Sequence, residues 1–235
     1  NGAYFYNAME INDLYLLVKN SAGICTDSRK INKGEVFFAL KGPNHNGNTH
    51  AFDAIGAGAI AAVVDDPALP GEKMVLVKDV FSTLNQLAEL QRNIINVPVI
   101  AITGTNGKTT TKELIKAVLS KKFKVHATEG NLNNHLGVPI TLLQCPADAG
   151  VLIIEMGANH PGEIAALCAI AQPDFGLITN IGRAHLEGFG SFEGVIQTKN
   201  ELYRWIIDHQ GTLFVNDDDL LLKSLVNDYP CYTYG

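Results

Sequence analysis

The chain has 235 residues, of which 46% are hydrophobic and 18% charged, a balance typical of a globular protein with a sizeable core. Its formal net charge is −6, and its largest basic cluster is the pair Lys121-Lys122, so we expect no nucleic-acid partner, which would require a basic face. The sequence has neither an apolar window of about twenty residues nor a signal-peptide pattern, so we expect no membrane insertion and a cytoplasmic location.

Residues 1–96 are predicted to form a small α/β domain. Helices are expected at 9–18, 50–58 and 80–94, and strands at 35–40, 61–65 and 75–77. Two features carry a functional signal, namely the polar turn with Ser28 and Arg29 and the Gly- and Asn-rich loop 41–49. Arginine and backbone donors suit an anionic or nucleotide-like group. Turn residues beside a surface arginine would give the same pattern, and both interpretations stay open.

Residues 97–235 are predicted to form a second α/β domain. Strands are expected at 97–103, 125–127, 151–156, 175–181 and 213–215, and helices at 109–121, 162–171 and 192–207. This alternation implies right-handed crossovers and a mostly parallel sheet with helices on both faces. Ligands of such sheets bind at the carboxyl ends of the strands. We therefore expect the functional residues at that edge.

A glycine turn between the first of these strands and the following helix predicts a phosphate-binding loop. The residues expected to contact ATP are Gly104, Thr105, Asn106, Gly107, Lys108, Thr109 and Thr110. Glycines let backbone N–H groups converge, the helix N-terminus adds positive charge, Lys108 reaches the phosphates and Thr109 can hold Mg²⁺. The longer G-x-x-x-x-G-K-[ST] pattern would need glycine where Ile102 stands, so the match is the shorter G-x-x-G-K-T-T form. The alternative is an ordinary turn rich in small residues.

Other polar residues follow predicted strands in the second domain. Glu155 ends an apolar strand and suits a Mg²⁺ ligand, although a capping or salt-bridged glutamate would look the same. Asn133 and Asn134 either bind substrate or cap and turn the chain. His185 follows the strand predicted at 175–181, where a structural role is the alternative to a ligand role. Lys199 lies in a predicted helix, where the residue pattern alone indicates a solvated lysine.

Five segments occur together in a fixed order. They are TGTNGKTTTKE (103–113), NLNNHLGVPITLL (131–143), EMGANHPGEI (155–164), TNIGRAHLEGFGS (179–191) and TKNELY (198–203). As a set they resemble the Mur ligase family, ATP-dependent enzymes that form amide bonds in peptidoglycan synthesis. The second and third segments are most similar to members that add D-alanyl-D-alanine to UDP-N-acetylmuramoyl-tripeptide, and TDSR at 26–29 agrees. The resemblance covers nearly the whole chain.

The resemblance implies a mechanism and a role for each site residue. ATP would phosphorylate the terminal carboxylate of the tripeptide, and the amine of D-alanyl-D-alanine would then displace phosphate. Lys108 would contact the β- and γ-phosphates, while Thr109 and Glu155 would hold one Mg²⁺. His185 would hold a second Mg²⁺, and Lys199 would be carbamylated and would also bind metal. Lys108, His185 and Lys199 are thus the implied catalytic residues.

The resemblance also implies how the substrates are bound. Asn133 and Asn134 would face the substrate, and Ser28, Arg29 and the loop 41–49 would hold its UDP end. A monomer is the expected state. Family members continue with the rest of the middle domain and a C-terminal domain, so we expect an incomplete sheet and little or no ligase activity from the 235 residues alone.

Three alternatives stay open at this point. The nearest is another amide ligase of the same superfamily, including the folylpolyglutamate type. A P-loop GTPase is a second, since Thr198-Lys199-Asn200-Glu201 resembles a guanine-reading motif, although it has Glu for Asp and lies in a helix. The third is a nucleotide-binding module without ligase activity.

Overall fold

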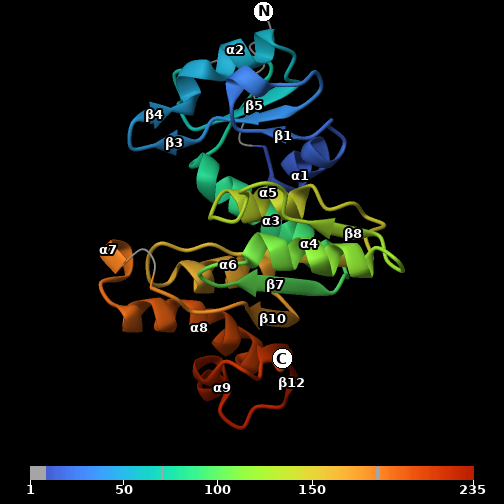
Figure 1. Cartoon of the computed structure of the whole chain (residues 1–235). Helices are drawn as coiled ribbons and strands as arrows, with labels where there is room; N and C mark the ends of the chain where they lie inside the picture. Colours follow the sequence, from blue (N-terminus) through green and yellow to red (C-terminus); the bar gives the residue numbers. More distant parts are fainter. Residues whose placement is uncertain (1–8, 70, 184–185) are drawn as a thin grey trace, which may run out of the picture. The chain divides into compact units, whose positions relative to one another are not determined.

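The computed structural model describes residues 9–69, 71–183 and 186–235 (Figure 1). Contacts divide the chain into two compact units, residues 1–91 and 92–235. The division between residues 91 and 92 lies within the helix α3 (Val80–Ile94), a few positions before the boundary that the sequence predicts after residue 96. Arg92 belongs to the second unit because its Nε donates to the carbonyl of Ala171 at 2.9 Å.

Unit 1 is built on a parallel sheet. Its strands lie in the order β1 (Ile24–Cys25), β2 (Val36–Phe38), β5 (Ala61–Val64) and β6 (Met74–Leu76). The helices are α1 (Ile11–Lys19), α2 (Ala51–Gly56) and α3, with 3₁₀ turns η1 (Ser28–Lys30) and η2 (Gly47–His50). Strands β2 and β5 are buried along their whole length, as their continuous apolar sequences predict for a parallel sheet covered on both faces. Phe37, Ala62 and Val64 lie in one core cluster.

The segment 41–49, expected to be a loop, contains an antiparallel hairpin of β3 (Lys41–Gly42) and β4 (His45–Asn46) followed by η2. Asn48, only 1% exposed, donates from Nδ2 to Oδ1 of Asp65 at 2.7 Å and accepts from the Asp65 backbone N–H at 3.1 Å. Lys41 pairs with the same carboxylate at 2.8 Å. These contacts join residues far apart in the sequence, which is why local pattern alone did not show the hairpin.

Unit 2 is built on a larger parallel sheet. The strand order is β12 (Cys231–Tyr234), β11 (Thr212–Asn216), β10 (Phe175–Ile178), β7 (Val99–Thr103), β9 (Val151–Glu155) and β8 (Val125–Ala127). The helices are α4 (Lys108–Leu119), α5 (Gly137–Leu143), α6 (Glu163–Ala171), α7 (Leu186–Phe189), α8 (Phe192–Asp208) and α9 (Leu220–Val226). The predicted α/β class with a mostly parallel sheet is confirmed.

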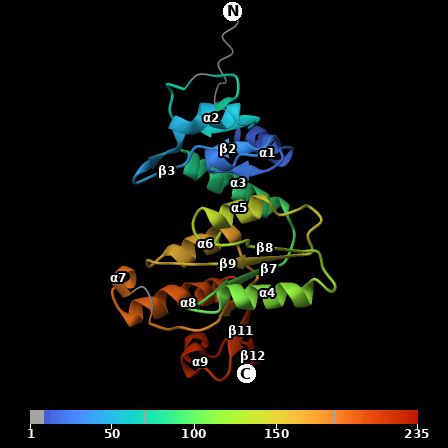
Figure 2. The same cartoon turned by 45° about the horizontal axis from the view of Figure 1, so that its top comes forward.

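Helices cover both faces of the sheet of unit 2. Ile115 and Leu119 of α4 pack against a cluster that includes Ile102 and Ile153. On the other face Gly176 of β10 lies directly under Ile206 of α8, where a larger residue would push the helix away. Figure 2 shows α4 and α6 on opposite sides of β7 and β9. This is the arrangement that right-handed crossovers running in opposite directions produce.

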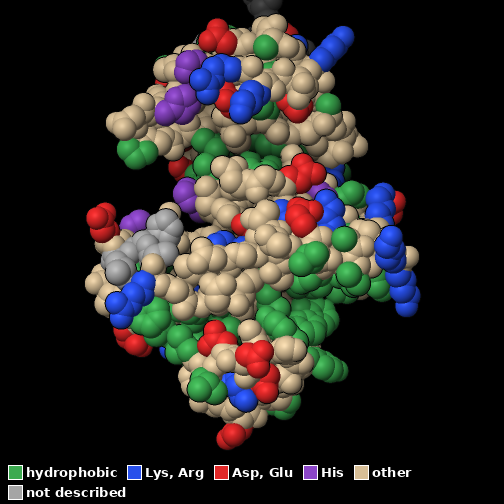
Figure 3. All heavy atoms as spheres, viewed as in Figure 1, with side chains coloured by type: hydrophobic (Ala, Val, Ile, Leu, Met, Phe, Trp, Pro, Cys, Tyr) green, Lys and Arg blue, Asp and Glu red, His purple; other side chains and the backbone are tan. Residues whose placement is uncertain are grey.

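Part of the α4 face of the sheet is apolar and exposed. Phe175, Phe214 and Tyr232 stack in a row across β10, β11 and β12, with ring centroids 6.2 and 5.9 Å apart. Tyr232 is 68% exposed, and Val118 of α4 is 70% exposed. In Figure 3 hydrophobic side chains gather on the surface over and below α4. Among the described residues no helix combines the length and hydrophobicity that crossing a membrane requires.

Candidate functional site

The strand ends of β9, β7 and β10 lie side by side. Glu155 pairs with Ile102, and Ile178 pairs with Thr103, so the segments that follow these strands leave the sheet at one edge. The turn 104–107 follows β7, and α4 begins at Lys108. The geometry therefore brings together the glycine turn, Glu155 and the segment after residue 178.

The turn has the backbone that its glycines permit. Gly104 and Gly107 have φ values of +145° and +78°, a region that other residues rarely adopt. A Cβ on Gly104 would also overlap the hydroxyl of Thr179. The first N–H groups of a helix have no partner within the helix, and Asn106, Gly107, Thr109 and Thr110 at this helix start are exposed. The turn can thus present N–H groups and helix-dipole charge to an anion.

The turn is fixed in place by the segment after β10. Asn180 clamps Asn106, accepting from its N–H at 3.1 Å and donating to its carbonyl at 3.0 Å. The Thr179 hydroxyl donates to the same carbonyl at 2.6 Å, and Thr105 Oγ1 accepts from the N–H of Gly182 at 2.9 Å. Sequence reasoning assigned Thr179 and Asn180 no role. Their position at the end of a strand next to β7 is the signal that could have shown it.

Glu155 lies at the centre of the site. The carboxylate accepts from the Thr109 hydroxyl at 2.9 Å and from Nδ2 of Asn133 at 2.8 Å, and the residue is 1% exposed. Its backbone N–H donates to the hydroxyl of Thr128 at 3.0 Å. A buried carboxylate beside a threonine hydroxyl offers the hard oxygen donors that Mg²⁺ prefers.

Lys108 lies beside this carboxylate. Its Nζ donates to the carbonyls of Gly104 and Thr105 at 2.8 and 3.2 Å. Burial lowers the pKa of Lys108, and the charge of Glu155 partly offsets that effect. The ammonium is thus held at the glycine turn, where a phosphate would meet it.

Lys199 is buried in the middle of α8 and is only 4% exposed. Burial first, and then the charge of Lys108, lower the pKa of Lys199 to about 8. Its Nζ lies 5.9 Å from the ring centroid of Phe189. Two residues on, Glu201 accepts from the N–H groups of Gly162 and Ala165 at the start of α6, at 2.7 and 2.8 Å. The structure therefore excludes the solvated lysine that the residue pattern alone indicated.

The remaining predicted residues fall in different surroundings. His185 lies outside the described residues. The Asn134 side chain accepts from the N–H groups of Leu136 and Gly137 at the start of α5, at 3.1 and 2.9 Å, so it caps that helix. Asn133 faces Glu155, as described above.

Ser28 and Arg29 lie in unit 1, in η1. The guanidinium of Arg29 is bidentate with Asp27, at 2.8 and 2.9 Å. This hydrogen bonding lowers the pKa of Asp27 to about 2. Arg29 is nevertheless 86% exposed at its side chain, so the pair leaves it open to a ligand.

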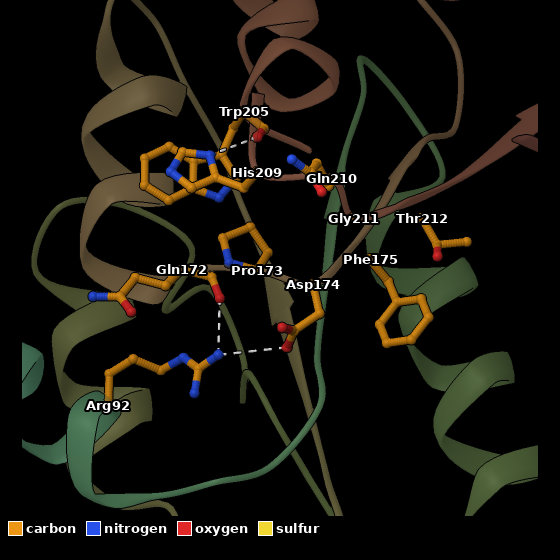
Figure 4. A pocket seen from close by; sticks show the side chains of 10 residues that line it. All are labelled: Arg92, Gln172, Pro173, Asp174, Phe175, Trp205, His209, Gln210, Gly211 and Thr212. Carbon is orange, nitrogen blue, oxygen red and sulfur yellow. Dashed lines mark hydrogen bonds and ion pairs between the residues drawn. The ribbon is translucent and has the colours of Figure 1, made fainter. Parts of the chain in front are cut away.

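A pocket of about 570 Å³ lies at the opposite edge of the sheet of unit 2, where β10 and β11 begin and α8 ends. Figure 4 shows Trp205 and His209 stacked above it, and Arg92 turned toward the Gln172 carbonyl and Asp174. Arg92 donates to that carbonyl at 2.9 Å and to Asp174 at 3.4 Å. The polar groups of Arg92, Gln172 and Asp174 are thus bonded to one another and join the end of α6 to the sheet. We therefore assign the pocket no ligand.

The fold and the site define unit 2 as a P-loop nucleotide-binding domain with a parallel sheet. The Mur ligase middle domain model matches residues 102–235, and the model for the Mur ligase family catalytic domain matches residues 20–104. The chain belongs to the Mur ligase family.

Named relatives agree with this assignment. The chain is 38% identical over 219 residues to the UDP-N-acetylmuramoyl-tripeptide–D-alanyl-D-alanine ligase of Bacillus subtilis, covering 91% of this chain and 47% of that protein. A crystal structure of MurF from Acinetobacter baumannii matches with a TM-score of 0.80 and 36% identity, over 90% of this chain and 48% of that one. MurF from Thermotoga maritima in complex with ADP matches with a TM-score of 0.78 and 34% identity, over 93% and 50%. The chain thus spans about half the length of these relatives.

Proposed function

We propose that the protein acts as an ATP-dependent ligase that joins D-alanyl-D-alanine to UDP-N-acetylmuramoyl-tripeptide in peptidoglycan precursor synthesis. The observation that carries the proposal is the contact between Thr109 and Glu155 beside Lys108, in a chain similar to enzymes of that name. The expected cytoplasmic location and monomeric state belong to the same proposal.

The glycine turn would bind the phosphates of ATP. The N–H groups at the start of α4 would donate to phosphate oxygens, and Lys108 would neutralise their charge. The clamp of Asn180 on Asn106 supports this role because it fixes the turn before the nucleotide arrives. Most of the rate acceleration in phosphoryl transfer comes from such positioning and charge neutralisation.

The donor set at Glu155 fits Mg²⁺. Thr109 and Glu155 would hold the ion, which when bound supplies charge neutralisation at the phosphates. Asn133 already bonds one oxygen of Glu155 and would keep the carboxylate turned toward the phosphates. His185 remains a proposed ligand of a second Mg²⁺.

Lys199 is the proposed site of carbamylation. Two ammonium groups, Lys108 and Lys199, repel each other across the site, and Lys199 is buried. Addition of CO₂ to the neutral amine forms a carbamate and releases a proton. This reaction would replace the repulsion with an attraction and provide a carboxylate-like metal ligand.

The residues proposed to bind the tripeptide substrate are Asn133, Asn134, Ser28 and Arg29. Asn133 is supported by its contact with Glu155, because it lies at the reacting end of the site. Arg29 is supported by its exposed guanidinium. Asn134 would act through its backbone, since its side chain caps α5.

The proposal is tested by nucleotide selectivity and by substrate dependence. Calorimetric titration of the chain should show binding of ADP with Mg²⁺ and much weaker binding of GDP, and selective GDP binding would instead favour a GTPase. In a protein of the relatives' length carrying this sequence, phosphate release from ATP should require both D-alanyl-D-alanine and UDP-N-acetylmuramoyl-tripeptide. Release with a different acceptor pair would indicate another amide ligase.

A further inference from the structure

Lys112 is a buried lysine in α4 to which the proposed reaction assigns no role. It is 1% exposed, although lysines are almost never fully buried unless their charge is paired. It lies four positions after Lys108, and residues at this spacing share one face of a helix. The positive charge of Lys112 therefore lies one helical turn after that of Lys108 in α4.

The ammonium of Lys112 is directed at the end of β8. Its Nζ donates to the Thr128 carbonyl at 2.6 Å and lies 3.1 Å from Oε1 of Glu113. Thr128 is itself 1% exposed, and its N–H donates to the Ile153 carbonyl of β9 at 2.9 Å. Lys112 thus ties α4 to the residue at which the chain leaves the sheet.

Thr128 connects this contact to Glu155 in two ways. Its hydroxyl accepts from the Glu155 N–H at 3.0 Å. It also begins the segment 128–134, which contains Asn133. The side-chain Nδ2 of Asn133 donates to the Glu155 carboxylate at 2.8 Å, and its backbone carbonyl accepts from the Gly157 N–H at 2.7 Å. The backbone and the carboxylate of Glu155 are therefore both held by the segment whose first carbonyl Lys112 binds.

Stability alone does not account for a lysine at this position. Burying an ammonium group costs free energy that the hydrogen bond to Thr128 and the ion pair with Glu113, whose side chain is 56% exposed, recover only in part. Methionine would fill a similar volume without that cost. Such a hydrogen bond does, however, fix a carbonyl in direction and distance. What the lysine adds is the placement of the segment 128–134.

We propose that Lys112 is a positioning residue for the magnesium–nucleotide site, acting through Thr128 on Asn133 and Glu155. This inference rests on the proposed function, because it assumes that Glu155 meets Mg²⁺. Lys112 itself contacts neither the nucleotide nor the metal. Its loss should loosen the carboxylate and leave the phosphate-binding turn, which Asn180 holds separately, unchanged.

The test separates the magnesium-dependent part of nucleotide affinity from the rest. ADP binding is measured by calorimetry on the 235-residue chain with Mg²⁺ and with EDTA, for wild type, Lys112→Met and the control Lys116→Met. Lys116 lies one turn further along α4 and is partly exposed. Wild type and the control should bind ADP more tightly with Mg²⁺. Lys112→Met should lose ~10–100-fold of affinity with Mg²⁺, the usual effect of removing a group that orients a metal ligand, and should match wild type in EDTA.

Each other result is decisive. Equal losses in both conditions, or no loss, would overturn the positioning role while leaving the proposed function intact. A wild type that binds no ADP, or binds it equally with and without Mg²⁺, would overturn the proposed function, and the role of Lys112 would fall with it. If Lys112→Met does not fold, Lys112→Gln is compared in the same way. Failure of both variants to fold would mean that Lys112 serves the fold itself.

Discussion

The hydroxyl of Thr109 donates a hydrogen bond of 2.9 Å to Oε2 of Glu155, joining the first turn of α4 to the end of β9. The two residues are 46 positions apart in the chain. A carboxylate, a hydroxyl and the ammonium of Lys108 therefore meet at the N-terminus of a helix. Such a site can bind a metal ion and a phosphate together.

Glu155→Gln should weaken ADP binding in the presence of Mg²⁺ by at least ~10-fold, equivalent to about 1.4 kcal/mol. Glutamine keeps the size of the side chain and an acceptor for Asn133 but lacks the charge that a metal ion requires. Isothermal titration with Mg²⁺ and with EDTA checks this, with Glu89→Gln, an exposed glutamate of α3, as control. Unchanged affinity in Mg²⁺ would remove Glu155 from the metal site.

In a ligase of the relatives' length, Glu155→Gln or Lys199→Ala should lower turnover at least ~100-fold.

Asn180→Ala should weaken ADP binding in both Mg²⁺ and EDTA by roughly 10–30-fold, because it removes two hydrogen bonds to Asn106, each contributing on the order of 1 kcal/mol. The loss should be independent of metal because the turn, and not the carboxylate, is loosened. Asn96→Ala, an exposed asparagine just before β7, serves as control. An affinity equal to that of wild type would mean that the turn keeps its shape without the clamp.

Lys199→Met should raise the stability of the chain at pH 7 by about 1–3 kcal/mol in buffer depleted of CO₂. The folded-state pKa of about 8 lies below the ordinary value of 10.5, so the unfolded state binds the proton more tightly. This penalty is fully present below pH 8 and disappears as the pH rises toward 10.5. Urea unfolding at pH 7 and pH 9.5 should therefore show a smaller difference between variant and wild type at the higher pH. A variant that is less stable at pH 7 would contradict the prediction.

Glu201→Ala should lower the stability of the chain by about 1–2 kcal/mol, because it leaves the N–H groups of Gly162 and Ala165 without their acceptor. Glu201→Gln keeps one acceptor oxygen and should lose less. Thermal unfolding of both variants measures the difference. Equal Tm values for Glu201→Ala and wild type would show that water replaces the carboxylate at no cost.

The bounds of helices and strands could be predicted where the sequence has a regular apolar periodicity. The bounds expected for the helix 80–94 and the strand 125–127 agree with α3 and β8, because apolar spacing alone defines them. The strand expected at 175–181 ends at Ile178, since Thr179 and Asn180 turn away to hold the glycine turn. Strand β12 and helix α9 were not predicted, because short segments with mixed polarity carry little periodic signal.

In the candidate site, too, some contacts could be predicted from the sequence and others could not. Glu155 and Thr109 both lie at predicted strand or helix ends, so their meeting followed from the rule for parallel sheets. The contact of Asn133 with Glu155 and the capping by Asn134 depend on the path of the segment 128–134, which no local pattern encodes. Lys112 was assigned no role from the sequence, because the burial of its ammonium depends on a contact with the end of β8. The roles of Ser28, Arg29 and His185 stay predictions.

The most direct test is a crystal structure of the chain with Mn²⁺ and a non-hydrolysable ATP analogue, using anomalous scattering to locate the metal. We expect a manganese peak within coordination distance of the Glu155 carboxylate and the Thr109 hydroxyl, with the phosphates on the N-terminus of α4 beside Lys108. A metal peak away from Glu155, or a nucleotide in the pocket beside Trp205 at the opposite edge of the sheet, would contradict this expectation.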